Sequence, residues 1–186
     1  YADDFIAGFQ YPWEAERFYE QLRSRMAKFG LELEENKSRI VESGRYLASL
    51  KAKRGESTRL GTFDFLGFTF YCGRTTKGNP WIMPKTSSKK FRQKVKEIKI
   101  WLYNNKEQKL GKLMYMLNVK LVGHYRYYGI SFNSRMISNY KQQVRELLYK
   151  VLNRRSEKKS YTREGFIEMM KYYKLVNPKI YYSLFC

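Results

Sequence analysis

The stretch Tyr1-Ala2-Asp3-Asp4-Phe5-Ile6-Ala7-Gly8 sets two adjacent carboxylates ahead of an apolar run. This pattern predicts a strand, a tight turn and a second strand, with Asp3 and Asp4 at the turn. Two neighbouring anions repel each other, so they stay ionised most readily when cations bridge them. Mg²⁺ prefers carboxylate oxygens, and two metal ions about 3.5–4 Å apart support nucleotidyl transfer. An ordinary surface Asp-Asp turn is the alternative.

The residues that follow predict a strand, a helix and a hairpin, as half of an α+β domain would give. The apolar residues have helical spacing up to Phe29, Pro12 can open that helix, and Gly30 can end it. We expect short strands at 5–9, 31–33 and 38–41, with a turn at 34–37 between the last two. The basic residues 45–60 predict an exposed loop or a partial helix.

The segment Phe63-Asp64-Phe65-Leu66-Gly67-Phe68-Thr69-Phe70 predicts one strand. The alternation of apolar residues along this segment is interrupted at Leu66-Gly67, which indicates a bulge or the close approach of another backbone. Residues 77–80 predict a turn, and residues 81–83 the return strand.

Beyond Pro84 the periodicity becomes helical. Ser87 or Ser88 can cap the first helix. Three apolar stripes predict three amphipathic helices that bury their stripes in one bundle, at residues 91–102, 110–121 and 136–151, and a last short helix is expected at about 162–174. The predicted fold class is therefore α+β, with short strands, a helix and a hairpin in residues 1–84 and a three-helix bundle in residues 85–186.

Charge is distributed unevenly along the chain. The 186 residues carry a net charge of +20, yet residues 1–50 hold 7 basic and 9 acidic side chains, so residues 51–186 carry +22. This asymmetry, together with 17 Tyr and 12 Phe, favours a nucleic-acid partner over a merely solubilising surface. The candidate nucleic-acid contacts are Lys85, Lys89, Lys90, Lys94 and Arg126.

Other classes of protein find little support in the composition. Two cysteines and one histidine exclude a zinc site. No apolar stretch reaches the length of a membrane span, so no membrane partner is expected. A reducing compartment such as the cytoplasm fits the cysteine content.

Several motifs together resemble one family. Tyr1-Ala2-Asp3-Asp4 resembles the YADD box of reverse transcriptases, residues 31–40 resemble the motif that follows that box, and residues 63–68 resemble the FDFLGF primer grip. Gly123-His124-Tyr125-Arg126-Tyr127-Tyr128-Gly129 is similar to a thumb segment of group II intron reverse transcriptase/maturases. The tail 178–184 resembles the end of one branch of that family. The resemblance covers the whole chain in the right order.

The resemblance implies a role for each matched residue. Asp3 and Asp4 would be two of three catalytic carboxylates that hold two Mg²⁺ ions, with Tyr1, Ala2 and Lys37 near the primer terminus and the nucleotide. The primer grip would be Phe65, Leu66 and Gly67. Residues 1–84 would be the end of the palm, and residues 85–186 the thumb or maturase domain. His124 is expected to be packed rather than catalytic.

The implied function is RNA-directed DNA synthesis by a bacterial group II intron protein. Its partners would be intron RNA, a template–primer duplex and dNTPs, and it would also assist splicing. The fingers and the third catalytic carboxylate are expected upstream of Tyr1, so the 186 residues alone should be inactive as a polymerase. Two alternatives remain open: a maturase fragment that only binds RNA, and a retron or defence-type reverse transcriptase.

Overall fold

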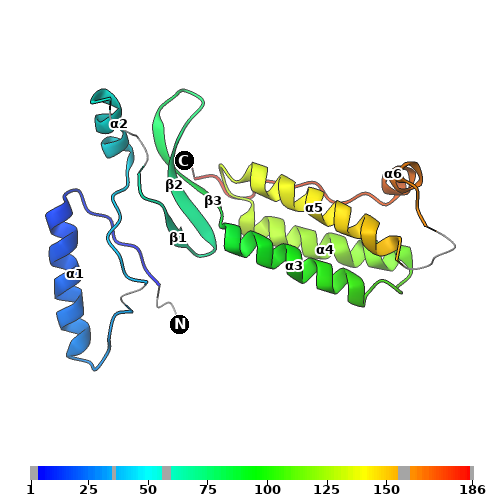
Figure 1. Cartoon of the computed structure of the whole chain (residues 1–186), viewed down its shortest axis with the longest axis horizontal. Helices are drawn as coiled ribbons and strands as arrows, with labels where there is room; N and C mark the ends of the chain where they lie inside the picture. The colour runs from blue at the N-terminus through cyan, green and yellow to red at the C-terminus, as the bar shows by residue number, and fades with distance from the viewer. Residues whose placement is uncertain (1–3, 35–36, 56–59, 155–159, 185–186) are drawn as a thin grey trace. The chain divides into compact units, whose positions relative to one another are not determined.

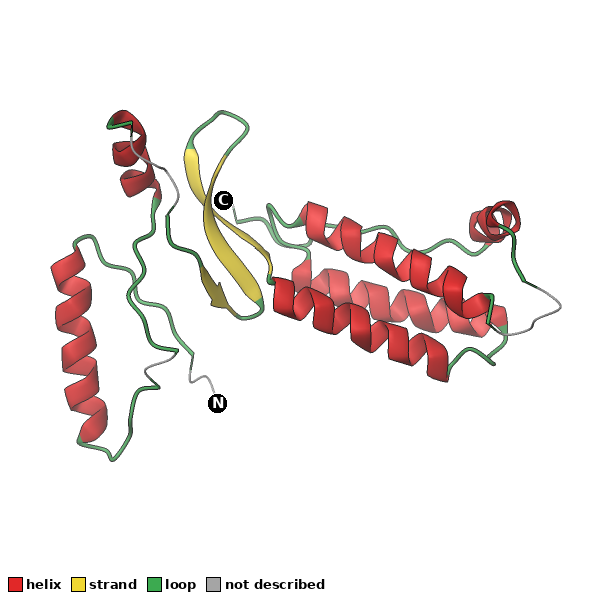
Figure 2. Ribbon diagram, in the orientation of Figure 1, coloured by secondary structure: helices red, strands yellow, loops and turns green. Residues whose placement is uncertain are grey.

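The computed structural model describes residues 4–34, 37–55, 60–154 and 160–184. Along these residues lie six helices and one three-stranded sheet (Figures 1 and 2). In chain order they are α1 (Pro12–Ala27), α2 (Arg45–Lys53), β1 (Phe63–Phe65), β2 (Phe68–Arg74), β3 (Pro80–Thr86), α3 (Ser88–Asn104), α4 (Leu110–Tyr128), α5 (Ser134–Leu152) and α6 (Arg163–Tyr172).

The chain divides into two compact units. The N-terminal unit comprises Tyr1–Phe65 and Phe70–Ile82, and the helical unit comprises Leu66–Thr69 and Met83–Cys186. The turn between β1 and β2 therefore belongs to the helical unit, although most of the sheet lies in the N-terminal one. The α+β class is confirmed, while the names palm and thumb for its parts stay predictions.

Helix α1 confirms the helix predicted from Pro12. Its start is fixed by Pro12 in the first turn and by the amide of Tyr11, which donates to Glu14 Oε2 at 3.2 Å. Gly30 follows the helix with a φ of +68°, which a glycine adopts without strain. All of α1 is described, and none of its side chains is buried. Helix α2 confirms the partial helix expected after residue 45.

The strands predicted at 5–9, 31–33 and 38–41 are wrong. Within the described residues, strands occur only between Phe63 and Thr86. Apolar alternation supplies the side-chain pattern of a strand, but a strand also needs a neighbour that pairs with its N–H and C=O groups. Residues 35 and 36 of the predicted turn at 34–37 lie outside the described residues, while Lys37 N donates to Glu34 O at 3.0 Å.

The segment predicted as one strand from Phe63 to Phe70 is a hairpin instead. Leu66 and Gly67 have φ values of +47° and +81° and connect β1 to β2. Two successive positive φ angles are typical of the two-residue turns whose twist matches that of paired strands. The sheet order is β1-β2-β3 (Figure 2), and the predicted turn and return strand appear as the β2–β3 connection and β3. Phe63 stacks on Phe70 across β1 and β2, with ring centroids 5.2 Å apart.

The predicted three-helix arrangement is confirmed in α3, α4 and α5, which run side by side (Figure 1). Ser87 is the cap of α3, since its Oγ accepts from Lys90 N at 3.3 Å. Helix α5 packs against both α3 and α4. The apolar core comprises Ile98, Leu102, Leu113, Met114, Leu117, Leu121, Ile137, Val144, Leu148 and Val151.

A buried polar residue fixes the loop between α4 and α5. Asn133 accepts a bond from Thr86 N and donates to Thr86 Oγ1 and Tyr128 O, each at 2.8 Å. These bonds satisfy the amide, so its burial carries little penalty. A side chain at Gly129 would collide with the carbonyl oxygens of Tyr125 and Lys179. The C-terminal tail can lie against this loop because the position is a glycine.

Candidate nucleic-acid interface

One side of α3 carries an uninterrupted row of cations. The helix has six Lys or Arg side chains and one carboxylate. Lys89, Arg92, Lys96 and Lys99 are exposed and follow a spacing of three, four and three residues, which keeps them on one side of the helix. In the described part of the chain, none of these four forms an ion pair. The row is about 15 Å long, enough to meet several phosphates of one strand.

The neighbouring side of α3 is more internally paired. Lys94 is half-buried, and its Nζ lies 2.8 Å from Glu97 Oε2. The ammonium of Lys94 lowers the pKa of Glu97 through that hydrogen bond. Further along, Lys120 of α4 lies over the ring of Trp101, 5.0 Å from its centroid. These contacts engage the ammonium groups of Lys94 and Lys120, which are therefore less available to a phosphate.

The β1–β2 turn lies against the C-terminal end of α4. Tyr127 Oη donates to Leu66 O at 2.9 Å, and Ser87 N donates to Gly67 O at 2.9 Å. An ideal Cβ at Gly67 would lie 3.2 Å from Tyr128 Oη and 3.5 Å from Lys90 Cγ. The structure therefore brings together Leu66, Gly67 and Lys90, three of the predicted contact residues.

His124 is packed, as the sequence predicts. Its ring is stacked on Tyr140, with centroids 3.7 Å apart and planes 15° apart. The pKa of His124 is lowered to about 4, mainly because the ring is buried and to a lesser extent because Lys94 is positively charged. The imidazole is therefore neutral near pH 7 and serves the packing between α4 and α5.

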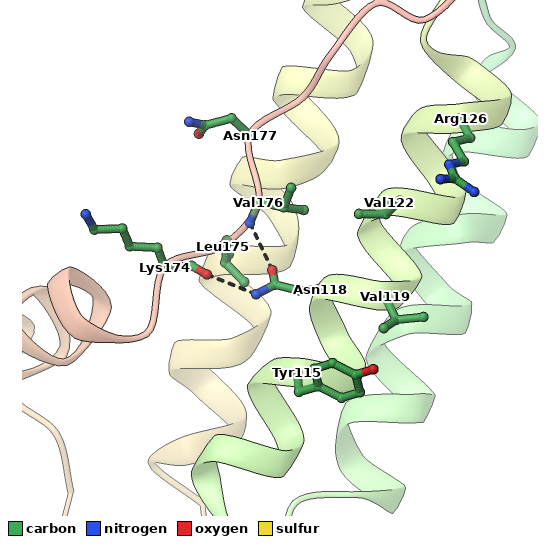
Figure 3. Close-up of a pocket in the computed structure, with 9 residues that line it drawn as sticks. All are labelled: Tyr115, Asn118, Val119, Val122, Arg126, Lys174, Leu175, Val176 and Asn177. Carbon is green, nitrogen blue, oxygen red and sulfur yellow. Dashed lines mark hydrogen bonds between the residues drawn. The ribbon is translucent and has the colours of Figure 1, made fainter.

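An open groove of about 520 Å³ lies between α4 and the segment after α6 (Figure 3). Tyr115, Val119 and Val122 form its α4 side, and Arg126 lies further along the same helix. Asn118 fastens the tail there, because its Nδ2 donates to Lys174 O at 3.0 Å and its Oδ1 accepts from Val176 N at 2.9 Å. Arg126 thus belongs to a different surface from the α3 row.

Most of the remaining predicted site residues lie in the N-terminal unit. Tyr1, Ala2 and Asp3 fall outside the described residues. Asp4 is exposed on the segment before α1, and Lys37 is exposed at its turn. Among the residues that the structure describes, no three His, Cys, Asp or Glu side chains are close enough to hold a metal ion. One placed carboxylate does not test the fit of two Mg²⁺ ions, so that site stays a prediction.

The other predicted contacts are distributed along β1, β3 and α3. Phe65 is half-buried at the end of β1, Lys85 is exposed near the end of β3, and Lys89 is exposed in the first turn of α3. Sequence reasoning missed Arg92, Lys96 and Lys99, although their spacing with Lys89 could have revealed the row. It also missed Tyr127 as a surface residue, because the sequence gives no sign of which tyrosine in that segment faces outward.

Comparison with known proteins gives one family match. Residues 88–173 match the model described as "Group II intron, maturase-specific domain". No curated protein and no solved structure matched the chain. None of the described helices has the length and apolar character needed to cross a membrane. The matched range covers α3 to α6, and it indicates a maturase role in splicing and binding of intron RNA. The described part of the chain from α3 to α6 is therefore a C-terminal region of the group II intron maturase type.

Proposed function

We propose that the helical unit binds intron RNA through the cation row of α3 and thereby assists splicing. The observation that carries this proposal is the row itself, Lys89, Arg92, Lys96 and Lys99, exposed and free of ion pairs within the described residues. Phosphates attract such a row whatever the base sequence, and they release counterions when it binds. A-form RNA suits this mode, because it is recognised mostly through its backbone and shape.

The test is the salt dependence of RNA affinity. We expect a steep fall in affinity with salt, with a logarithmic slope of about −0.7 to −0.9 for each phosphate contact. The quadruple variant with glutamine at Lys89, Arg92, Lys96 and Lys99 should bind more weakly and show a slope smaller by roughly three. Affinity would be measured by filter binding with a structured intron RNA.

A matched control removes the same charge elsewhere. Glutamine at Arg17, Arg25, Lys28 and Lys77, all exposed in the N-terminal unit, lowers the net charge equally but leaves α3 intact. This control should keep nearly the wild-type slope. Equal effects of the two quadruple variants would show that only net charge matters and would overturn the assignment to α3.

We further propose that the complete protein makes DNA on an RNA template. In this proposal Asp3 and Asp4 hold two Mg²⁺ ions, Lys37 lies near the nucleotide phosphates, and the turn at Leu66-Gly67 places the primer. The supporting observation is the hairpin of β1 and β2, which carries an exposed Leu66 at its tip. In this proposal, DNA synthesis also needs a template–primer duplex, dNTPs and an upstream fingers and palm portion. A bacterial cytoplasmic location is part of the same proposal.

Primer extension tests this second proposal. The chain would be joined to the fingers and upstream palm of a related reverse transcriptase and supplied with Mg²⁺, dNTPs and a primed RNA template. Asp3→Ala and Asp4→Ala should each abolish synthesis and leave RNA affinity nearly unchanged, whereas Glu16→Gln, a change at another exposed carboxylate, should keep synthesis. Synthesis that survives both aspartate changes would overturn the proposed role of Asp3 and Asp4, whereas a folded joined protein that makes no DNA would leave RNA binding as the whole function.

A further inference from the structure

The two adjacent tyrosines at the end of α4 have opposite environments. Tyr128 is buried, whereas the Tyr127 side chain is 55% exposed. The ring of Tyr127 is stacked on Phe68, with centroids 6.0 Å apart and planes 10° apart. Phe68 is buried, so the core supports one face of the Tyr127 ring while much of the ring meets solvent.

The hydroxyl group of Tyr127 restrains the ring as well. It donates to the carbonyl of Leu66 at 2.9 Å, so the ring is held both at its phenol end and along one face. The restraint also acts on the turn, which is further fixed by the bond from Ser87 N to Gly67 O. A ring already held in one orientation loses little rotamer entropy when a ligand binds to it.

The surroundings of this ring suit a nucleotide. Leu66 is 59% exposed at the turn and offers an apolar contact to a sugar or base. The side chain of Lys90 passes close to Gly67. Lys90 is exposed, so its ammonium group can reach a phosphate. An exposed aromatic face beside an aliphatic contact and a cation is the combination that binds unpaired nucleotides, whose bases stack on aromatic side chains.

We propose that Tyr127 is a stacking site for one unpaired base of bound RNA, with Leu66 and Lys90 as its neighbours. This inference rests on the proposed RNA binding and adds a second mode to it. The α3 row would bind phosphates of any strand, while the site around Tyr127 would favour RNA that presents an unpaired nucleotide.

The experiment uses the whole chain and two RNA hairpins with the same stem. One is blunt, and the other has a four-nucleotide 3′ overhang containing the fluorescent base 2-aminopurine. We expect the wild type to prefer the overhang and to quench its fluorescence. Tyr127→Ala should remove the quenching and weaken overhang binding roughly tenfold, without changing affinity for the blunt hairpin. Tyr127→Phe keeps the ring and loses the bond to Leu66, so it should quench but bind the overhang less tightly than the wild type.

The matched control is Tyr115→Ala, because Tyr115 is another exposed tyrosine of α4, 71% exposed, that lines the groove beside the tail. It should leave both the preference and the quenching intact. Loss of the preference in Tyr115→Ala instead would place the base in that groove and overturn the proposal, as would a wild type that binds both hairpins equally. Unchanged blunt-hairpin affinity and circular dichroism show that a variant is folded. Failure of the wild type to bind either hairpin would overturn the proposed RNA binding as well.

Discussion

The two units use similar apolar patterns with different results. In the helical unit, Leu117 of α4 is fully buried, because α5 packs against α4. In the N-terminal unit, α1 has apolar residues at helical spacing yet buries none of its side chains, and Phe29 just beyond it is 69% exposed. Periodicity predicted a helix correctly in both places. Burial needs in addition a partner surface, and among the described residues α1 has none that buries its side chains.

The same difference separates the predicted strands that formed from those that did not. β1 and β2 are joined by a two-residue turn, so each strand has its pairing partner next to it in the chain. Residues 5–9 have no strand beside them among the described residues. Their Phe5 and Phe9 instead contact Phe18 of α1, with ring centroids 6.5 and 5.1 Å apart. Local sequence therefore determines a hairpin more reliably than an isolated strand of a larger sheet.

The largest expected loss of stability follows from truncating a side chain in the helical core. Leu117→Ala should lower the free energy of unfolding of the helical unit by about 2–5 kcal/mol, because it leaves a cavity among fully buried side chains. Phe29→Ala, an equally drastic truncation in the N-terminal unit, should change stability by less than about 0.5 kcal/mol. Chemical denaturation followed by circular dichroism measures both. Similar losses for the two variants would contradict the contrast between the units.

Acid should destabilise the helical unit through its one histidine. The pKa of His124 is lowered to about 4 in the folded state, against about 6.5 in an unfolded chain. The unfolded state therefore binds more protons between these values, and stability falls as the pH drops from about 6.5 to about 4, by at most roughly 3 kcal/mol. Unfolding measured against pH tests this, with His124→Phe as the control. An equally steep fall between pH 6.5 and 5 in the control would refute the role of His124.

The smallest effect concerns a buried hydroxyl. Tyr125 is fully buried, its Oη has no hydrogen-bond partner among the described residues, and burial raises the pKa of the phenol. Tyr125→Phe removes an unsatisfied group, so it should leave stability unchanged or raise it by up to about 1 kcal/mol. Tyr149→Phe is the matched control, because Tyr149 Oη donates to Tyr161 O at 3.3 Å and should lose a few tenths of a kcal/mol. A clear loss in Tyr125→Phe would reveal a partner for that hydroxyl.

Sequence reasoning recovered most of the helical unit. The stripes at 91–102, 110–121 and 136–151 became α3, α4 and α5, and the cap at Ser87 was among the two residues expected. It failed at the hairpin, where the interrupted alternation at Leu66-Gly67 was attributed to a bulge or to the close approach of another backbone rather than to a turn. An alternation that breaks by one step fits both, and only the positive φ angles of these two residues decide between them.

By itself the sequence determined the helices, the uneven charge and the resemblance to group II intron maturases, because periodicity, composition and motifs are local properties of the chain. Only the tertiary structure decided which residues form a surface. Tyr127 and Tyr128 are neighbours in sequence, yet one is exposed and the other buried, since successive residues point about 100° apart around a helix. Their environments are set by Phe68 and the turn before it, some sixty residues earlier in the chain.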